Sequence, residues 1–473
     1  MATTKISGRE LRKLGYPEGK VIGIAMKVLE EKYKGKSKKQ KLELLAQVVK
    51  NPEFYLKHDS LAPVAKSLII KTEHNETVEL NKNRLDYRIY GAEGIEPGAI
   101  NQMEIAMKLP VTKAGALMPD AHQGYGLPIG GVLATDNAVI PYAVGVDIGC
   151  RMCMTLYDIR PEFIEQNGFK LKKMLIDNTR FGNEVFRQPV DHEVLERSAF
   201  NEINILKSLK DRAYSQIGSS GGGNHFVEFG IGEIMEADNE WGLPTGRYLA
   251  VLSHSGSRGL GANVARHYTR LAMDKCRLPK EARHLAWLGL DTDDGAEYWN
   301  AMNLAGDYAS ACHHQIHERL SATLGEKPLM MVENHHNFAW KESDRFGNEV
   351  IVHRKGATPA EKGVLGIIPG SMTAPGFIVR GKGLADSLNS ASHGAGRVMS
   401  RRKAKETLSK REVDEHLKKA GIEVIGSGLD EAPMVYKDIH QVMSYQTALV
   451  EILGTFTPRI VRMCGDKRFG EVD

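Results

Sequence analysis

The sequence lacks the long hydrophobic runs of a membrane protein, since no stretch approaches the roughly 18 consecutive apolar residues of a membrane span. Its first twenty residues are polar and basic, unlike a secretory signal peptide. Cysteine is scarce, with five residues at no regular spacing, so a disulfide framework is not expected. These absences predict a cytoplasmic protein with no membrane partner. In that setting a functional cysteine is a metal ligand or a nucleophile rather than half of a disulfide.

The usual short motifs for nucleotides and structural metals are also missing. The glycine-rich segment GSSGGGNHF has neither the Walker lysine nor GxGxxG spacing, so neither standard nucleotide fold is indicated. Cys150 and Cys153 form one CxxC pair without a second, which argues against a zinc ribbon. Three histidines share a helical spacing: His313, His314 and His317. They lack the glutamate of an HExxH motif, and we expect them on an ordinary helix surface.

The net charge is small, +4 from 63 Lys and Arg against 59 Asp and Glu, so it does not by itself indicate a polyanion partner. Basic residues nevertheless gather in two segments. The first contains six lysines and no acidic residue: Lys32, Lys34, Lys36, Lys38, Lys39 and Lys41. The second follows His393: Arg397, Arg401, Arg402, Lys403, Lys405, Lys410 and Arg411. The first segment is either a solvated basic turn or a contact for nucleic-acid phosphates, and the second case would make binding strongly salt-dependent. The second segment is either a solvated helix or an anion site, because that helix would begin at the HGAG turn, where its dipole and the arginines favour an anion.

The chain divides into a helical N-terminal extension (1–83) and a single large catalytic domain (84–473), in which no linker or internal repeat is visible. Ser7 and Glu10 form a capping-box pattern that predicts a short first helix. Further helices are expected at 21–29, 42–49, 192–212, 261–276, 294–324 and 397–420. Buried strands ending in glycine turns are expected in GGVLATDNAVIPYAVGVDIG, RYLAVLSHSG, PLMMVEN, GVLGIIPG and GFIVRG. The alternation predicts a mixed α/β (α+β) fold.

Five residues with metal-binding side chains each lie between a strand-like apolar run and a group of small residues. They are Asp147, Cys150, His225, His254 and His336. The pattern predicts strand ends that bring ligands into one pocket, where glycines let a phosphate-bearing ligand approach the backbone. Cysteine with histidine favours zinc, whereas the carboxylate and an open phosphate site leave room for manganese. A bridging thiolate could hold two cations.

His393 stands in the turn SHGAGR, beside backbone amides and Arg397. This setting suits an imidazole nucleophile that attacks a phosphoryl group while metal ions stabilise the developing charge. Two alternatives remain on spacing alone: a sixth metal ligand, or a hydrogen-bond donor to phosphate.

These segments resemble, in order along the chain, the motifs of the RtcB-type RNA-splicing ligase family. The motifs are MPDAHQGYGLPIGGV (118–132), VGVDIGC (144–150), GGGNHFVE (221–228), HSGSRGLG (254–261), HN (336–337), PGSM (369–372), SHGAGR (392–397) and EAPMVYKD (431–438). The resemblance covers roughly residues 84–473. It implies an RtcB-like α/β fold and an enzyme that uses GTP and two manganese ions.

The resemblance also implies residue roles. Asp147, Cys150 and His225 would hold one ion, and Cys150 would bridge to a second ion held by His254 and His336. His393 would carry GMP as a phosphoramidate and pass it to an RNA 3′-phosphate, often formed from a 2′,3′-cyclic phosphate. An RNA 5′-hydroxyl would then displace GMP and join the strands, in RNA repair or tRNA splicing. The small activator protein archease is a further implied partner.

The nucleotide contacts implied by the resemblance share the glycine-rich and strand-end segments. They are Asn224, His225, Phe226, Val227, Glu228, His336, Asn337, Pro369, Gly370, Ser371, Met372, Gly376, His393, Gly394, Ala395, Gly396 and Cys464. Asp120 and His122 lie in a motif near the reaction centre.

Two positions depart from the family pattern. Gly376 stands where a serine is usual near the guanine, and Cys464 where a lysine contacts the nucleotide. A lost buried donor costs about 1–3 kcal/mol, enough to weaken guanine selection. Two alternatives therefore stay open: a metal-dependent phosphatase or cyclic phosphodiesterase acting on RNA ends, and a non-catalytic RNA-binding paralogue.

Overall fold

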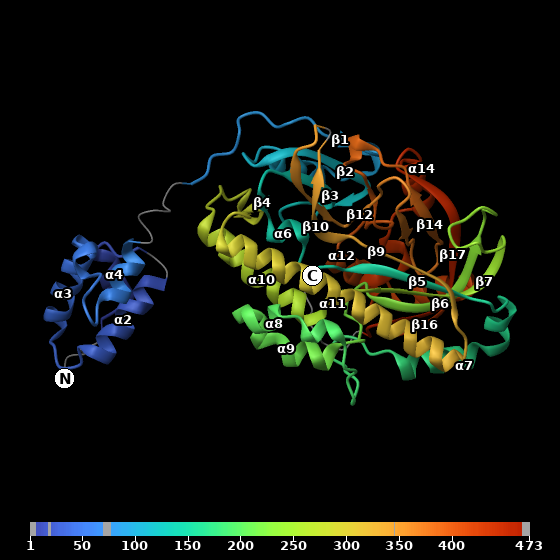
Figure 1. The fold of residues 1–473 in the computed structure, drawn as a ribbon, viewed down its shortest axis with the longest axis horizontal. Coiled ribbons are helices and arrows are strands. Elements are labelled where there is room, and N and C mark those ends of the chain that lie inside the picture. The colour runs from blue at the N-terminus through green and yellow to red at the C-terminus, as the bar shows by residue number, and fades with distance from the viewer. Residues whose placement is uncertain (1–5, 18–19, 70–76, 345, 466–473) are drawn as a thin grey trace. The chain divides into compact units, whose positions relative to one another are not determined.

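The computed structural model describes residues 6–17, 20–69, 77–344 and 346–465. They fall into two compact units, residues 1–78 and 79–473 (Figure 1). No helix in these described ranges is long and apolar enough to cross a membrane.

The N-terminal unit is a small helical bundle. Its elements are α1 (Gly8–Lys13), α2 (Lys20–Lys32), α3 (Lys38–Lys50), η1 (Pro52–Tyr55) and α4 (Ala62–Ile69). The predicted capping box of Ser7 and Glu10 begins α1, and a second box at Ser37 begins α3. The apolar faces of these helices close a core of their own, in which Leu11, Leu45 and other side chains are fully buried. The three helices predicted in this segment are confirmed, and α4 is an addition.

An eight-stranded sheet forms the centre of the larger unit. Its path runs β13-β14-β17-β6-β7-β5-β9, and β16 pairs with β17 outside that path. The bounds are β5 (Arg151–Tyr157), β6 (Phe226–Ile234), β7 (Gly246–Ser255), β9 (Pro328–His335), β13 (Leu365–Ile368), β14 (Gly376–Gly381), β16 (Glu423–Ile425) and β17 (Val450–Met463). Neighbours along the path are antiparallel, and β13 and β9 lie at its two ends. The helices packed along this sheet include α7 (Glu162–Asn178) and α11 (Asp293–Leu324) (Figure 1).

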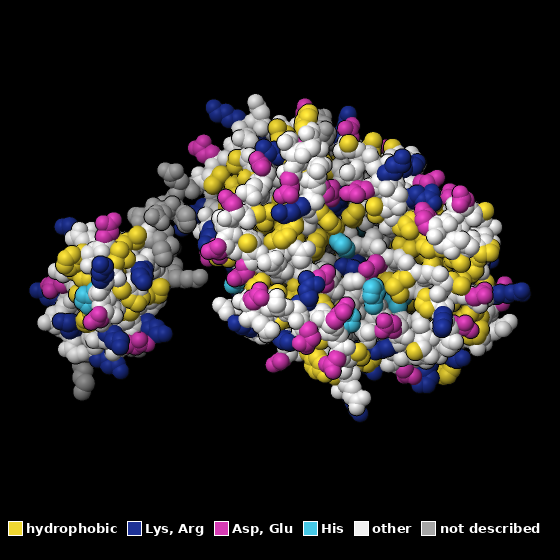
Figure 2. Space-filling model, viewed as in Figure 1, with side chains coloured by type: hydrophobic (Ala, Val, Ile, Leu, Met, Phe, Trp, Pro, Cys, Tyr) yellow, Lys and Arg dark blue, Asp and Glu magenta, His cyan; other side chains and the backbone are white. Residues whose placement is uncertain are grey.

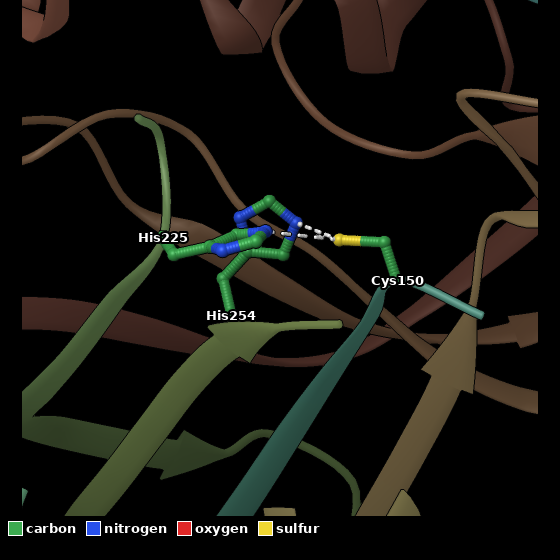
Figure 3. A group of neighbouring side chains, drawn as sticks. All are labelled: Cys150, His225 and His254. Atoms are coloured by element: carbon green, nitrogen blue, oxygen red, sulfur yellow. Dashed lines mark hydrogen bonds between the residues drawn. The ribbon is translucent and has the colours of Figure 1, made fainter. Parts of the chain in front are cut away.

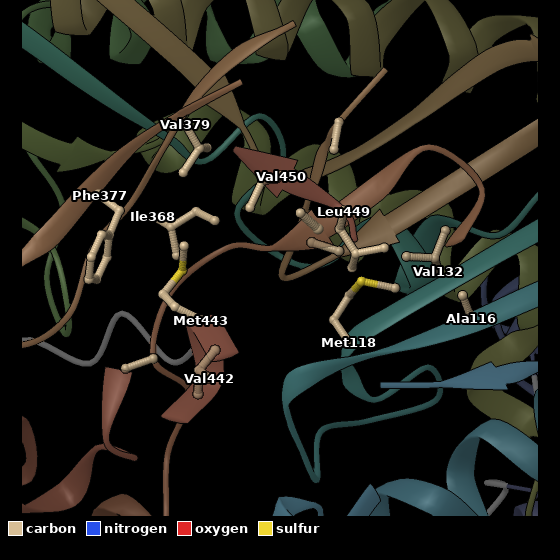
Figure 4. Packing of buried hydrophobic residues seen from close by; sticks show 14 of the residues in the cluster. Ala116, Met118, Val132, Ile368, Phe377, Val379, Val442, Met443, Leu449 and Val450 are labelled. Carbon is tan, nitrogen blue, oxygen red and sulfur yellow. The ribbon is translucent and has the colours of Figure 1, made fainter. Parts of the chain in front are cut away.

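A second, five-stranded sheet has the order β1-β2-β3-β11-β10. Its strands are β1 (Arg88–Ile89), β2 (Thr112–His122), β3 (Ile129–Thr135), β11 (Glu349–Lys355) and β10 (Asn337–Ser343). Met118 and Val132 of this sheet share one buried cluster with Ile368 and Phe377 of the larger sheet's strands (Figure 4). The chain passes from one sheet to the other at His336, between β9 and β10. The two sheets thus share a core, which confirms the mixed α/β class.

The long helices expected in the larger unit are confirmed in part. The stretches at 261–276 and 294–324 are confirmed as α10 (Arg258–Lys275) and α11. The stretch at 192–212 is broken into η3 (Glu193–Glu196), α8 (Ala199–Glu202) and α9 (Asn204–Gln216). The prediction of a single helix at 397–420 was wrong, because α12 (Arg401–Thr407) and α13 (Lys410–Ala420) replace it. Ser400 and Ser409 each cap a new helix, and Leu408 between them is extended, so no helix begins at the HGAG turn.

Candidate active site

The predicted metal ligands meet at one end of the eight-stranded sheet. Cys150 directly precedes β5 and His225 directly precedes β6, while His254 lies near the end of β7 and His336 follows β9. Because β7 is antiparallel to both β5 and β6, the start of those two strands lies beside the end of β7. Met152 and Phe226 both pair with His254 across the ladder. Residues from four separate segments thereby reach one point.

The side-chain donor atoms converge closely (Figure 3). The Sγ atom of Cys150 lies 3.1 Å from Nε2 of His254 and 3.4 Å from Nε2 of His225. Nε2 of His254 is also 3.2 Å from Nε2 of His336. On the other side, Nε2 of His225 lies 3.0 Å from Oδ2 of Asp147. All five predicted ligands are therefore part of one continuous cluster.

This donor set fits metal ions better than it fits hydrogen bonds alone. One thiol has a single proton, yet two ring nitrogens approach Cys150 and a third approaches His254. Burial lowers the pKa of His254 to about 3, so its imidazole is neutral and offers a lone pair. Burial alone would raise the pKa of Asp147, but the hydrogen bond and charge of His225, together with Cys150 and His254, outweigh burial and lower that pKa, which favours the carboxylate. A thiolate, imidazoles and a carboxylate are the ligands that zinc or manganese accepts.

Two glycines make room for these ligands. A Cβ atom on Gly256 would collide with the carboxylate of Asp147, and one on Gly221 would collide with the ring of His225. Neither position tolerates a side chain without displacing a ligand. The glycines beside the predicted ligands thus serve close packing of the metal-binding side chains, as well as any approach of phosphate to the backbone.

His393 is held by a buried carboxylate. Its Nδ1 lies 2.6 Å from Oδ2 of Asp120, and the same oxygen accepts the backbone N–H of His393 at 3.2 Å. Asp120 belongs to β2 and is fully buried. Its burial raises its pKa, but the hydrogen bond and charge of His393 outweigh that effect and lower it. An ionised Asp120 accepts the Nδ1 proton, which leaves the lone pair of His393 on Nε2. The His393 and His336 rings are 5.0 Å apart, so the imidazole borders the metal-ligand cluster.

A cavity of about 710 Å³ encloses this group. Its volume is in the range of small-molecule sites. On the face drawn in Figure 2, histidine side chains (cyan) lie near the middle of the larger unit. The predicted residues in its lining are Asp147, Cys150, Asn224, His225, Phe226, Glu228, His254, His336, Asn337, Pro369, Gly370, Ser371, Met372, Gly376, His393, Gly394, Ala395 and Gly396. Gly376 is among them, and a Cβ atom there would meet Pro369 at 3.4 Å, an ordinary contact.

Two of the residues predicted to contact the nucleotide have side chains outside the cavity lining. Val227 and Cys464 are absent from the lining, and both pack in a hydrophobic cluster with Phe229 and Ile460. In β6 the side chains alternate between faces, so Phe226 and Glu228 point to the cavity and Val227 to the opposite face. Cys464 similarly follows Met463, which does line the cavity. The position that carries lysine in the family pattern therefore does not present its side chain to the cavity in this chain.

Some residues in the lining were not singled out from the sequence. Lys355 ends β11, lines the cavity, and donates from Nζ to the backbone oxygen of Tyr125 at 2.6 Å. Burial lowers the pKa of Lys355 to about 7. The sequence alone could have indicated Lys355, because a lysine at the end of a strand and before a glycine repeats the pattern of the metal-ligand segments. The second basic segment, which the sequence did indicate, contributes Arg397, Arg401 and Arg402 to the lining, although Arg397 pairs with Glu431 at 3.4 Å.

The placement of the helical histidines was wrong for two of the three. His313 and His317 are fully buried between α11 and the sheet, and only His314 is partly exposed, beside Glu333. Cys153 lies close enough to His313 and His317 for these three side chains to be considered as metal ligands. Every ring nitrogen of the two histidines is nevertheless hydrogen-bonded, at 2.7–3.1 Å, to Ser253, Thr155 or the backbone oxygen of Ser255. The arrangement is a buried hydrogen-bond chain: Thr155 to His317 to Ser253 to His313 to the backbone of Ser255.

Comparison with known proteins identifies the family of this chain. The family model described as tRNA-splicing ligase RtcB matches residues 102–207 and 183–463. The RNA-splicing ligase RtcB of Escherichia coli K12 is 34% identical over 394 residues, which cover 76% of this chain and 93% of that protein. The tRNA-splicing ligase RtcB of Nanoarchaeum equitans is 31% identical over 456 residues, covering 80% and 95%. The chain belongs to the RtcB family.

Proposed function

We propose that this chain, an RNA ligase by its family, joins RNA 3′-phosphate or 2′,3′-cyclic phosphate ends to 5′-hydroxyl ends. It would use GTP and two manganese ions and act through guanylated His393, in RNA repair or tRNA splicing. One observation carries the proposal: His393, oriented by the buried Asp120, borders a five-residue metal-ligand cluster in one cavity. A nucleophile with a fixed tautomer beside a cation site is what phosphoryl transfer needs.

The protein's own residues define the steps. The Nε2 lone pair of His393 attacks the α-phosphorus of GTP, the P–O bond to pyrophosphate breaks, and Asp120 stabilises the positive charge on the ring. An oxygen of the RNA 3′-phosphate then attacks the same phosphorus, and the P–N bond returns its electrons to His393. Finally the RNA 5′-hydroxyl attacks the activated 3′-phosphorus and GMP leaves, which completes the phosphodiester. A cyclic phosphate must first be opened by water to expose the 3′-phosphate.

As the family resemblance implies, Asp147, Cys150 and His225 would hold one metal ion, and Cys150, His254 and His336 would hold the second. When bound, the ions would neutralise phosphate oxygens as negative charge develops on them. The thiol of Cys150 must stay reduced, which suits the cytoplasm, and no cysteine in the described part of the chain forms a disulfide.

Glu228, Asn337 and the backbones of Pro369–Met372 and His393–Gly396 would surround the nucleotide. Asn337 is already fixed, because its Oδ1 accepts the N–H of Gly356 at 2.9 Å. Burial raises the pKa of Glu228 well above its usual value, which favours a protonated carboxyl that can donate a hydrogen bond. RNA ends would be the substrate, and an archease-like activator would assist turnover.

The test is transfer of label from [α-³²P]GTP to the protein in the presence of manganese. The wild type, His393→Ala and the exposed control His267→Ala would be separated under denaturing conditions. We expect acid-labile label on the wild type and the control only. Label on His393→Ala would disprove the mechanism. Absence of label from every protein, together with release of phosphate from RNA 3′-phosphate ends, would instead identify an end-healing phosphatase.

A further inference from the structure

The positive charge of this protein is concentrated in its N-terminal unit. Residues 1–78 contain 16 Lys and Arg against 9 Asp and Glu, a net charge of +7. The remaining residues contain 47 against 50, a net charge of −3. The net positive charge of the small unit (+7) is therefore larger than that of the whole chain (+4), because the larger unit is slightly negative. Dark-blue Lys and Arg side chains are spread across its face in Figure 2.

The strongest concentration is the turn between α2 and α3. Six lysines occupy residues 32–41 without an acidic residue among them. Lys32, Lys34, Lys36 and Lys39 are exposed, and none of these four has an ion-pair partner among the residues that the structure describes. The other two differ: Nζ of Lys38 lies 2.9 Å from Oε1 of Glu10, and Lys41 is buried.

This arrangement is not explained by the stability of the unit. The core is closed by leucine, valine and alanine side chains, and the four exposed lysines take no part in it. The first turn of α3 contains lysines and no acidic residue, and cations are unfavourable at a helix N-terminus. Like charges crowded on one short turn also repel one another. Lys32 is favourably placed in the last turn of α2. The crowded lysines as a set nevertheless add a repulsion that the fold of the unit does not require, which points to a partner that removes it.

We infer that the N-terminal unit is an RNA-binding module whose α2–α3 turn contacts the phosphate backbone. The inference deepens the proposed function and rests on it, because the RNA bound here is the RNA whose ends are joined. Closely spaced lysines, four of them exposed and without an ion-pair partner among the described residues, match the regular negative charge of a nucleic-acid backbone and select no base. Since the unit is covalently joined to the catalytic unit, RNA held by one is concentrated near the other.

The experiment measures binding and catalysis separately in the full chain. The test variant carries Lys32→Gln, Lys34→Gln, Lys36→Gln and Lys39→Gln. The control carries the same change of charge at four other exposed lysines of this unit: Lys13, Lys27, Lys57 and Lys66. The probe is a fluorescent RNA hairpin with a 5′-phosphate and a 3′-hydroxyl, ends that cannot be joined, so its affinity reports backbone binding alone. Affinity is measured by anisotropy from low to high salt.

We expect the test variant to bind the hairpin at least about 10-fold more weakly at moderate salt. The slope of log affinity against log salt should become shallower by about 0.7–0.9 for each phosphate that the variant no longer neutralises. The control should lose clearly less affinity. Labelling by GTP should be unchanged, and the KM for ligatable RNA should rise without a change in kcat. An unchanged salt slope, or an equal loss in the control, would overturn the inference.

The two proposals fail in different ways. If the wild type is never labelled by GTP but the test variant loses hairpin binding and salt dependence, the module stands and the ligase mechanism falls. If labelling and ligation proceed normally while all three proteins bind the hairpin alike, the mechanism stands and the module falls.

Discussion

Asp120 and His393 are 273 residues apart in the chain, yet Oδ2 of Asp120 lies 2.6 Å from Nδ1 of His393. The same carboxylate oxygen accepts the backbone N–H of His393, so it fixes both the ring and the turn that carries it. This contact joins β2 of the five-stranded sheet to the loop after β15 (Ser390–Ser392). The contact fixes the tautomer of the proposed nucleophile His393, as the buried aspartate fixes that of the histidine in a Ser-His-Asp triad.

The first prediction concerns this contact. Asp120→Asn keeps the size of the side chain but removes the charge that stabilises a positively charged ring. The amide can also donate to Nδ1, which would move the ring proton to Nε2, the attacking atom. We expect the rate of labelling by GTP to fall on the order of 10²–10⁴-fold, with the metal content unchanged. Single-turnover labelling checks the rate, and the exposed-site change Asp386→Asn is its control. A reduction below about threefold would contradict the positioning role.

The second prediction concerns the shared thiol. Cys150→Ser replaces a thiolate with a poorly ligating hydroxyl at the atom that approaches both His225 and His254. We expect it to reduce bound manganese or zinc from about two equivalents to less than one, because both proposed ions depend on Cys150. Elemental analysis after gel filtration measures this. Cys276→Ser, at a buried cysteine outside the cavity, should keep the wild-type content.

A third prediction tests the glycine beside the ligands. Gly256→Ala would drive a Cβ atom into the carboxylate of Asp147, so either the carboxylate or the loop must move. We expect at least a tenfold loss of metal affinity with the protein still folded. Gly168→Ala, where a Cβ atom meets nothing within 4 Å, is the matched control. Titration of the metal-free proteins compares the two, and equal affinities would show that Asp147 does not need its present position.

How much of this site could be foreseen depends on how local each signal is. Cys150 and His254 are recognisable because an apolar strand and small residues flank each one, and that pattern is contained in a few residues. The pairing of Asp120 with His393 is set by the packing of separate segments, so no local pattern reveals it. Lys355 was recognisable in principle, since its strand end and following glycine repeat the ligand pattern.

Other outcomes have equally specific causes. Val227 is predicted as a nucleotide contact together with its neighbours in one motif, and strand alternation turns its side chain away from the cavity. For His313 and His317, helical spacing correctly predicts a shared face, but the spacing cannot tell whether that face meets solvent or a sheet. In α11 that face lies on β5 and β7, where hydroxyl groups of Thr155 and Ser253 satisfy the rings.

The buried histidine chain leads to a prediction about acid stability. Burial lowers the pKa of His317 from 6.5 to about 3, so the folded state keeps it neutral while the unfolded state takes up a proton below pH 6.5. The stability that this group contributes is therefore fully present above pH 6.5 and is lost progressively as the pH falls from 6.5 towards 3. Each buried histidine of this kind makes the free energy of unfolding fall by up to about 1.4 kcal/mol more for each unit by which the pH is lowered in this range.

His317→Gln tests this prediction, because it retains polar groups for Thr155 and Ser253 but cannot be protonated. We expect it to lower the free energy of unfolding by about 1–3 kcal/mol near neutral pH and to reduce the dependence of that free energy on pH below 6.5. Urea unfolding of metal-free protein across the acidic range measures both effects, with the exposed-site variant His267→Gln as control. An unchanged pH dependence would mean that His317 is not held neutral by burial.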